Sequence, residues 1–306
     1  MAGLSGLAPV GGATSMVSSA RIEAVASVNR TARRKRFMIA TVEPLPVTIK
    51  LGAAVVGRFG LVTETRPHED VTMNSLEGKT AIVTGVSRGI GLAICRALQD
   101  AGARLGLIGR QKPPPDVVGT FVHCDFADVE SVPGAVRELV ASLGSVDFLV
   151  NNAGTFLEKP VPELALADWE RVLRVNLTAT FLVTREVLAG MIARRQGRII
   201  NIASTASVQG YLHQSAYVAS KHALLGFARA LALEVRPHNI HVHSLCPGGV
   251  RTDLLQGTYL GRRLEGQAMI EPADVAAMVI FLLQQPDNID LPEVIVRRFD
   301  ATAPAR

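Results

Sequence analysis

The feature that most constrains the fold of this chain is a regular alternation of short β-rich runs with longer amphipathic stretches, which begins at Leu76. Strands that alternate with helices of about 10–15 residues indicate βαβ units and a parallel sheet with helices on both faces. Such connections are right-handed, and ligands bind at the carboxyl ends of the strands. The pattern therefore predicts an α/β fold, a doubly wound parallel sheet in a single domain over residues 76–306.

The boundaries of the expected elements follow from the same runs. Strands are expected at residues 80–84, 104–108, 120–124, 147–151, 197–203, 240–245 and 293–297. Helices are expected at residues 89–101, 129–143, 169–194, 217–235 and 273–283.

The segment before this domain has a different composition. Residues 1–42 are rich in Ala, Ser, Gly, Thr and Arg, and their six cations face a single carboxylate, Glu23. This segment alone accounts for the formal net charge of +5, so the neutral remainder does not indicate a nucleic-acid partner. The composition is typical of an organelle transit peptide, for which a plastid is favoured over a mitochondrion.

Two other interpretations of these residues stay open. The segment is a plain disordered extension, or the protein starts at Met73 and the upstream residues are a gene-model error. In either case the expected location is the cytoplasm. Residues 43–72 have two close prolines and no clear hydrophobic period, as a linker does. We therefore expect residues 1–75 to be a disordered N-terminal extension.

Cysteine, hydropathy and histidine patterns exclude further classes of protein. Three scattered cysteines, Cys95, Cys124 and Cys246, form no disulfide framework and favour a reducing compartment. No apolar run of about 18 residues is present, so we expect no membrane-spanning helix and no membrane partner. His241 and His243 share one face of an expected strand, but no ligand at suitable spacing completes a metal site. We therefore expect no metal.

A glycine-rich turn, TGVSRGIG at residues 84–91, joins the first expected strand to the first expected helix. Gly85 permits a tight turn, Gly89 permits close approach to a pyrophosphate, and Gly91 permits packing of the helix against the sheet. Free N–H groups at the start of the helix attract the phosphates. With these flanks, the turn predicts a dinucleotide site in a Rossmann-like fold.

The end of the second expected strand predicts which dinucleotide is bound. An acidic residue at this place binds the ribose 2′-hydroxyl of NAD, but this chain has Arg110 there. Arg88 lies in the glycine turn itself. Two guanidinium groups bind a 2′-phosphate through charge-assisted hydrogen bonds, so NADP(H) is favoured over NAD(H). The alternative is that both arginines are ordinary solvated surface charges.

Three side chains suggest proton transfer at a carbonyl group. Tyr217 and Lys221 are spaced i and i+4, so they lie on one face of an expected helix. A nearby ammonium lowers the pKa of a phenol, which makes the pair a candidate general acid and base. Ser204 ends an expected strand, where its hydroxyl can donate to a substrate oxygen.

Taken together, the order and spacing of these motifs resemble those of the short-chain dehydrogenase/reductase family, close to its 3-oxoacyl-acyl-carrier-protein reductase branch. The resemblance covers about residues 76–283. Its motifs are the glycine turn, Asp125, the run NNAG at residues 151–154, Asn176, Ser204, Tyr217, Lys221, and Pro247-Gly248 with Thr252.

The resemblance implies a role for each site residue. Tyr217 should exchange a proton with the carbonyl oxygen as NADPH delivers hydride, and Ser204 should orient that carbonyl. Lys221 should also hold the nicotinamide ribose, and Asn176 should hold a water in a proton relay to Lys221. The residues expected to bind the cofactor are Gly85, Ser87, Arg88, Gly89, Ile90, Gly91, Arg110, Asp125, Phe126, Asn152, Ala153, Gly154, Tyr217, Lys221, Pro247, Gly248, Val250 and Thr252.

The chain also departs from that family. It ends in the run DLPEVIVRR at residues 290–298 where lipid-synthesis members often have a Gly-Gly tail, and we expect a short lid at residues 254–267. We predict an NADPH-dependent oxidoreductase that reduces a small-molecule carbonyl to a secondary alcohol. The alternatives are a 3-oxoacyl-acyl-carrier-protein reductase of fatty-acid synthesis and, in another class, a non-catalytic dinucleotide-binding scaffold. The resemblance also implies a homodimer or homotetramer formed through the helices at residues 169–194 and 217–235.

Overall fold

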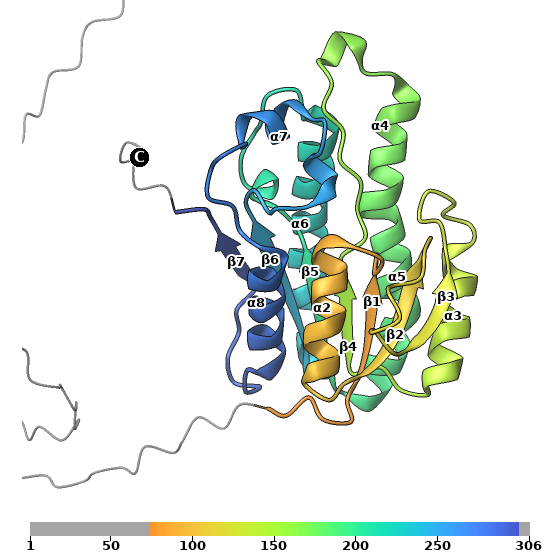
Figure 1. Cartoon of the computed structure of the whole chain (residues 1–306). Helices are drawn as coiled ribbons and strands as arrows, with labels where there is room; N and C mark the ends of the chain where they lie inside the picture. Colours follow the sequence, from red (N-terminus) through yellow and green to blue (C-terminus); the bar gives the residue numbers. More distant parts are fainter. Residues whose placement is uncertain (1–73, 300–306) are drawn as a thin grey trace, which may run out of the picture. The chain divides into compact units, whose positions relative to one another are not determined.

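The computed structural model describes residues 74–299, and its centre is a seven-stranded parallel sheet (Figure 1). The strands lie in the order β3-β2-β1-β4-β5-β6-β7. Their bounds are β1 (Thr80–Thr84), β2 (Arg104–Gly109), β3 (Thr120–His123), β4 (Phe148–Asn151), β5 (Gly197–Ile202), β6 (Ile240–Pro247) and β7 (Glu293–Val296). The prediction of a doubly wound parallel sheet is confirmed. The predictions for residues 1–73, including the transit peptide, lie outside the described residues.

Helices cover both faces of this sheet. The α-helices are α2 (Gly89–Asp100), α3 (Val132–Leu143), α4 (Leu166–Leu173), α5 (Ala179–Arg194), α6 (Ser215–Val235), α7 (Tyr259–Arg263) and α8 (Pro272–Gln284). Helices α2 and α8 pack together on one face, and α3, α5 and α6 cover the other (Figure 1). Most expected boundaries hold to within a few residues. The third strand and the helix at residues 129–143 are shorter than expected, because residues 124–131 form a loop and turn.

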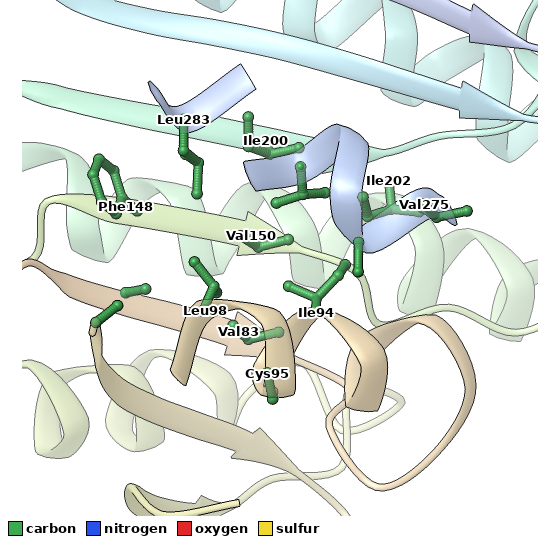
Figure 2. Packing of buried hydrophobic residues seen from close by; sticks show 14 of the residues in the cluster. Val83, Ile94, Cys95, Leu98, Phe148, Val150, Ile200, Ile202, Val275 and Leu283 are labelled. Atoms are coloured by element: carbon green, nitrogen blue, oxygen red, sulfur yellow. The ribbon is translucent and has the colours of Figure 1, made fainter. Parts of the chain in front are cut away.

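Each helical layer buries its own hydrophobic core, because successive side chains of a strand point to opposite faces. Val83 and Val150 pack against α2 and α8, where Ile94 and Leu98 meet them (Figure 2). Ile82, between Ala81 and Val83 on the same strand, belongs to the second core with α3 and α5. A strand that is buried on both faces has a continuous apolar run, and in β1 this run is residues 81–83.

The helix expected at residues 169–194 differs from the prediction. It begins at Leu166 and contains a π-helical turn, η3 (Arg174–Thr178), between α4 and α5. Among the described residues, Leu166–Arg194 is the helix long and apolar enough to cross a membrane, with a mean hydropathy of 1.3, which the sequence analysis did not expect. Its side chains Val183, Val187 and Met191 are buried against the sheet, as in a core helix of a soluble protein.

The expected lid at residues 254–267 lies above the sheet and contains α7 (Figure 1). Thr258 caps this short helix, because its hydroxyl accepts a hydrogen bond from the amide of Gly261 at 2.9 Å. The 3-10 turn η6 (Asp253–Leu255) leads from the segment after β6 into the lid, and Asp253 is counted with the lid from here on.

Candidate active site

A cleft of about 870 Å³ lies at the carboxyl ends of the strands. All of the residues expected to bind the cofactor line it, and so do Ser204, Tyr217 and Lys221. Asn176 does not line the cleft and is buried behind it. The sheet thus brings together residues that lie as far apart in the sequence as Gly85 and Thr252.

The glycine turn has the backbone that the sequence analysis expected. Gly85 and Gly89 have φ angles of +74° and +58°, a region that favours glycine. A Cβ on Gly85 would lie 2.9 Å from the Cα of Ala153, so the turn lies directly against the chain that follows β4. Gly91 differs from the prediction, because a Cβ there would collide with the turn itself, at the carbonyl of Gly85, and with the amide of Asn152.

Asn152 holds this turn in place. Its Nδ2 donates to the carbonyls of Thr84 and Gly85 at 2.9 and 3.0 Å. In return, the Thr84 hydroxyl accepts from the amides of Asn152 and Ala153, both at 2.9 Å. Asn152, expected to bind the cofactor, lines the cleft, and its side-chain amide shapes the glycine turn.

The two arginines expected at a 2′-phosphate both line the cleft and are exposed. Arg110 directly follows β2. Arg88 lies 3.6 Å from Asp253 of the lid, an ion pair that the sequence analysis missed. Because both partners are more than half exposed, solvent screens this pair.

Tyr217 lies in the first turn of α6, which begins at Ser215, two residues before the expected start. Its ring packs edge-on against Phe156, with 4.9 Å between ring centroids. Burial raises the pKa of Tyr217 to about 12, although its hydrogen bond with Ser204 acts in the opposite direction. The prediction of a lowered tyrosine pKa is therefore wrong, because desolvation raises the pKa more than the hydrogen bond with Ser204 lowers it.

Lys221 lies one turn further along α6, on the same face as Tyr217. Its Nζ is 5.8 Å from the centroid of the tyrosine ring and donates to the carbonyl of Ile202 at 2.9 Å. Burial lowers the pKa of Lys221 to about 8. The ammonium is thus held by the Ile202 carbonyl at the end of β5, and it begins to lose its proton in the pH range in which many enzymes work.

Asn176 lies in the π-helical turn η3 and is anchored on three sides. Its Oδ1 accepts from the amide of Thr155 at 2.7 Å, and its Nδ2 donates to the carbonyl of Thr155 and to the Ser220 hydroxyl, both at 3.0 Å. A Cβ added to Gly154 would lie 3.4 Å from Asn176 Oδ1 and 3.9 Å from Lys221 Nζ. Asn176 and Lys221 therefore both approach Gly154, although Thr155 already uses much of the asparagine's bonding capacity.

Two further sequence-expected regions complete the cleft. Gly248 lies beside β7, since its amide donates to the carbonyl of Val296 at 2.8 Å. A Cβ on Gly89 would lie 3.3 Å from the methyl group of Thr252, which brings the segment after β6 onto the glycine turn. Asp125 shapes the loop after β3 by accepting from the amide of Ala127 at 3.0 Å.

Sequence reasoning missed several residues that line the cleft, because no motif marks them. They come from the loop after β4, the loop after β5, the lid and the end of the chain, and they include Phe156, Tyr211, Asp253, Arg297 and Arg298. The run at residues 290–298 was noted only as a departure from a family pattern, and its position beside the cleft was not foreseen.

Comparison with known proteins supports the assignment made from these motifs. The model of the family described as short chain dehydrogenase matches residues 79–262, more than half of the chain. The chain belongs to the short-chain dehydrogenase family. The resemblance in the sequence analysis is thereby confirmed, and the members of this family are oxidoreductases that act on carbonyl and hydroxyl groups.

Individual relatives are similar over nearly their whole length. A 3-oxoacyl-[acyl-carrier-protein] reductase of Aquifex aeolicus is 35% identical, covering 72% of this chain and 96% of its own. A putative ketoacyl reductase of granaticin polyketide synthesis from Streptomyces violaceoruber is 39% identical, covering 66% and 85%. The crystal structure of a metagenomic short-chain oxidoreductase in complex with NADP has a TM-score of 0.64 at 34% identity, covering 74% of this chain and 99% of its own.

Proposed function

We propose that this oxidoreductase reduces a carbonyl group to a secondary alcohol with NADPH, and that Tyr217 is its general acid and base. One observation carries the proposal: Tyr217, Ser204 and Lys221 line the same cleft as the glycine turn. Hydride chemistry and proton chemistry can therefore take place in one space.

The residues present fit an NADP cofactor. The turn at Gly85 and Gly89 leaves a backbone surface without Cβ atoms at the start of α2, which suits a pyrophosphate. Arg88 and Arg110 would hold the 2′-phosphate, and the segment from Pro247 to Thr252 would cover the nicotinamide end. When bound, NADPH supplies the hydride. The relative solved with NADP supports the choice of this cofactor.

The protein side of the reaction then follows from the pKa directions. With a pKa near 12, Tyr217 carries its proton at neutral pH and can donate it to a carbonyl oxygen. Ser204 Oγ accepts from the amide of Ala206 at 3.1 Å and forms a hydrogen bond with Tyr217, so both hydroxyls can turn toward the same carbonyl oxygen. Lys221 stabilises the charge left on Tyr217, and Asn176 positions the loop at Thr155.

The main alternative within this chemistry is reduction of a 3-oxoacyl thioester on acyl-carrier protein. The names of the two reductase relatives support it, whereas the run at residues 290–298 in place of a Gly-Gly tail does not. A non-catalytic scaffold would have no need for the buried Lys221 and the Tyr217–Ser204 hydrogen bond, so we favour an enzyme.

We also propose that the protein forms a homodimer or homotetramer through α5 and α6. Apolar side chains exposed on these helices support it, since Phe181 is 42% exposed and Leu233 is 69% exposed. A plastid location, if residues 1–42 are a transit peptide, stays a proposal that a fluorescent fusion of these residues would test.

The first experiment replaces the proposed acid by Tyr217→Phe and follows NADPH oxidation over ketones, oxo acids and acyl thioesters. Loss of the hydroxyl should lower kcat by roughly 100-fold or more, the usual contribution of a general acid. NADPH affinity, measured by fluorescence titration, should stay close to that of the wild type. Tyr259→Phe, a second tyrosine outside the cleft lining, is the matched control. Full activity of Tyr217→Phe would overturn the mechanism.

A further inference from the structure

The last described segment of the chain lies beside the cleft. Strand β7 pairs with β6 so that Val296 lies opposite Pro247. The two residues that follow, Arg297 and Arg298, leave the sheet at the edge where the cleft opens, and both line it. A Cβ on Gly248 would lie 3.8 Å from the Cα of Arg297, which shows how closely this segment passes the end of β6.

Uncharged groups hold both guanidinium groups. Arg297 donates to Gln209 Oε1 at 3.3 Å. Arg298 donates to Gln267 Oε1 at 2.7 Å and to the carbonyl of Ala268 at 3.3 Å. Within residues 74–299, no carboxylate lies within the 4.0 Å ion-pair distance of either arginine. A guanidinium has five N–H donors, so both keep donors for a further acceptor.

A chain of hydrogen bonds runs from Arg297 toward the reacting centre. Gln209, which accepts from Arg297, donates through Nε2 to the Tyr211 hydroxyl at 2.5 Å. That hydroxyl lies 2.7 Å from Thr205 Oγ1, and Thr205 follows Ser204. The chain therefore ends at the residue next to Ser204, whose hydroxyl we propose to orient the carbonyl.

The charge at this end of the cleft is unbalanced. Of the carboxylates that line the cleft, Asp253 is beside Arg88, and Asp125 is bonded to the amide of Ala127 in the loop after β3. The side chains that line the cleft from the lid are largely apolar, namely Leu254, Leu255, Leu260 and Leu264. Unbalanced cations in a cleft with apolar walls concentrate anions.

We propose that Arg297 and Arg298 form a subsite for an anionic group of the substrate, a carboxylate or a phosphate distant from the reacting carbonyl. This inference rests on the proposed function and names its substrate class. Guanidinium groups bind both anions through paired, charge-assisted hydrogen bonds. The preferred substrates are then oxo acids or phosphate-bearing acyl thioesters, and neutral ketones of similar shape are poor substrates.

The experiment compares matched anionic and neutral substrates in the full chain. The pairs are 3-oxobutanoate with its ethyl ester, and 3-oxobutanoyl-coenzyme A with the N-acetylcysteamine thioester. In the double variant Arg297→Gln/Arg298→Gln, KM for an anionic member should rise about tenfold or more, while its neutral partner changes less than about twofold. The pair that responds more strongly distinguishes carboxylate from phosphate. Arg297→Lys/Arg298→Lys should restore much of the preference, and Arg104→Gln, at the far end of β2, is the control.

Calorimetric binding of 3-oxobutanoyl-coenzyme A and of 3-oxobutanoate keeps the test independent of turnover. Affinity for at least one of them should fall about tenfold in the glutamine double variant and should weaken with salt in the wild type. If the wild type and the glutamine double variant had equal affinities and equal KM values, the subsite proposal would be overturned. If the wild type reduced no carbonyl but the double variant still lost binding, the proposed function would fail and the subsite would stand.

Discussion

Arg110 is the residue on which the choice of cofactor most directly depends. It directly follows β2 at the point where NAD-binding sites place an acidic residue, and it lines the same cleft as Arg88. Arg88 forms an ion pair with Asp253, whereas Arg110 forms no ion pair among the described residues. Arg110 is thus the freer of the two cations for a 2′-phosphate.

Charge reversal at this residue should change the cofactor preference. In Arg110→Asp, a carboxylate would repel the 2′-phosphate and accept a hydrogen bond from a 2′-hydroxyl, so the ratio of kcat/KM for NADPH over NADH should fall by roughly tenfold or more. Steady-state rates with both cofactors measure this ratio. Arg104→Asp makes the same charge change at the other end of the strand and should leave the ratio alone. An unchanged ratio in Arg110→Asp would contradict the 2′-phosphate assignment.

At the scale of elements, the carboxylate of Glu158 links the lid to the loops after β4 and before α6. Glu158, in the loop after β4, accepts from the amide of Leu260 in α7 at 3.2 Å. It also accepts from Nε2 of Gln214 at 3.1 Å, and Gln214 directly precedes α6. Helix α7 has only five residues and cannot be stable alone, so contacts such as this one, and that of Arg298 with Gln267, hold the lid in place.

Removing that carboxylate should loosen the lid. Hydrogen bonds to a charged group contribute about 1.5–3 kcal/mol, so in Glu158→Ala the lid should open roughly tenfold more often. Limited trypsin digestion should then cut faster after Arg262 and Arg263, which mass spectrometry of the fragments would locate. Glu163→Ala, in the exposed 3-10 turn η2 (Val161–Glu163), is the control. Equal cleavage rates in the two variants would show that Glu158 does not hold the lid.

At the scale of the whole molecule, the acid stability of the sheet should depend on one buried histidine. His243 on β6 is fully buried, its Nδ1 lies 2.9 Å from the carbonyl of Leu291, and its Nε2 has no protein partner. Burial lowers the pKa of His243 to about 4, and the cationic Arg198 nearby acts in the same direction. As the pH falls, His243 is therefore protonated in the unfolded chain before it is protonated in the folded chain.

The sign of the pH effect follows from this difference. Between pH 6.5 and about 4 the unfolded chain binds more protons at this histidine, so stability falls as the pH falls through that window, by roughly 3 kcal/mol in total. His243→Asn does not titrate and can still donate to Leu291, so it should lose less stability between pH 7 and 5. Urea unfolding at both values measures the loss, with the exposed His123→Asn as control. Parallel losses in wild type and His243→Asn would contradict the prediction.

Some features of the whole fold could be predicted from the sequence, and others could not. The parallel sheet, the glycine turn and the convergence of Ser204 with Tyr217 follow from local patterns, because parallel strands bring their carboxyl ends to one edge. The raised pKa of Tyr217 depends on burial by distant segments, which no local pattern contains. The place of Arg297 beside Gln209 likewise depends on strand pairing across the sheet.

The π turn between α4 and α5 has a consequence for insertions and deletions. One wide turn there accommodates a residue more than a regular helix would, and it is the turn that presents Asn176 to Thr155. Deleting a residue within it would restore regular winding and leave the faces of α4 and α5 close to their present directions, because the wide turn absorbs the extra residue. Such a chain would keep the buried side chains of α5 on the sheet but lose the bulge that carries Asn176 to the loop after β4.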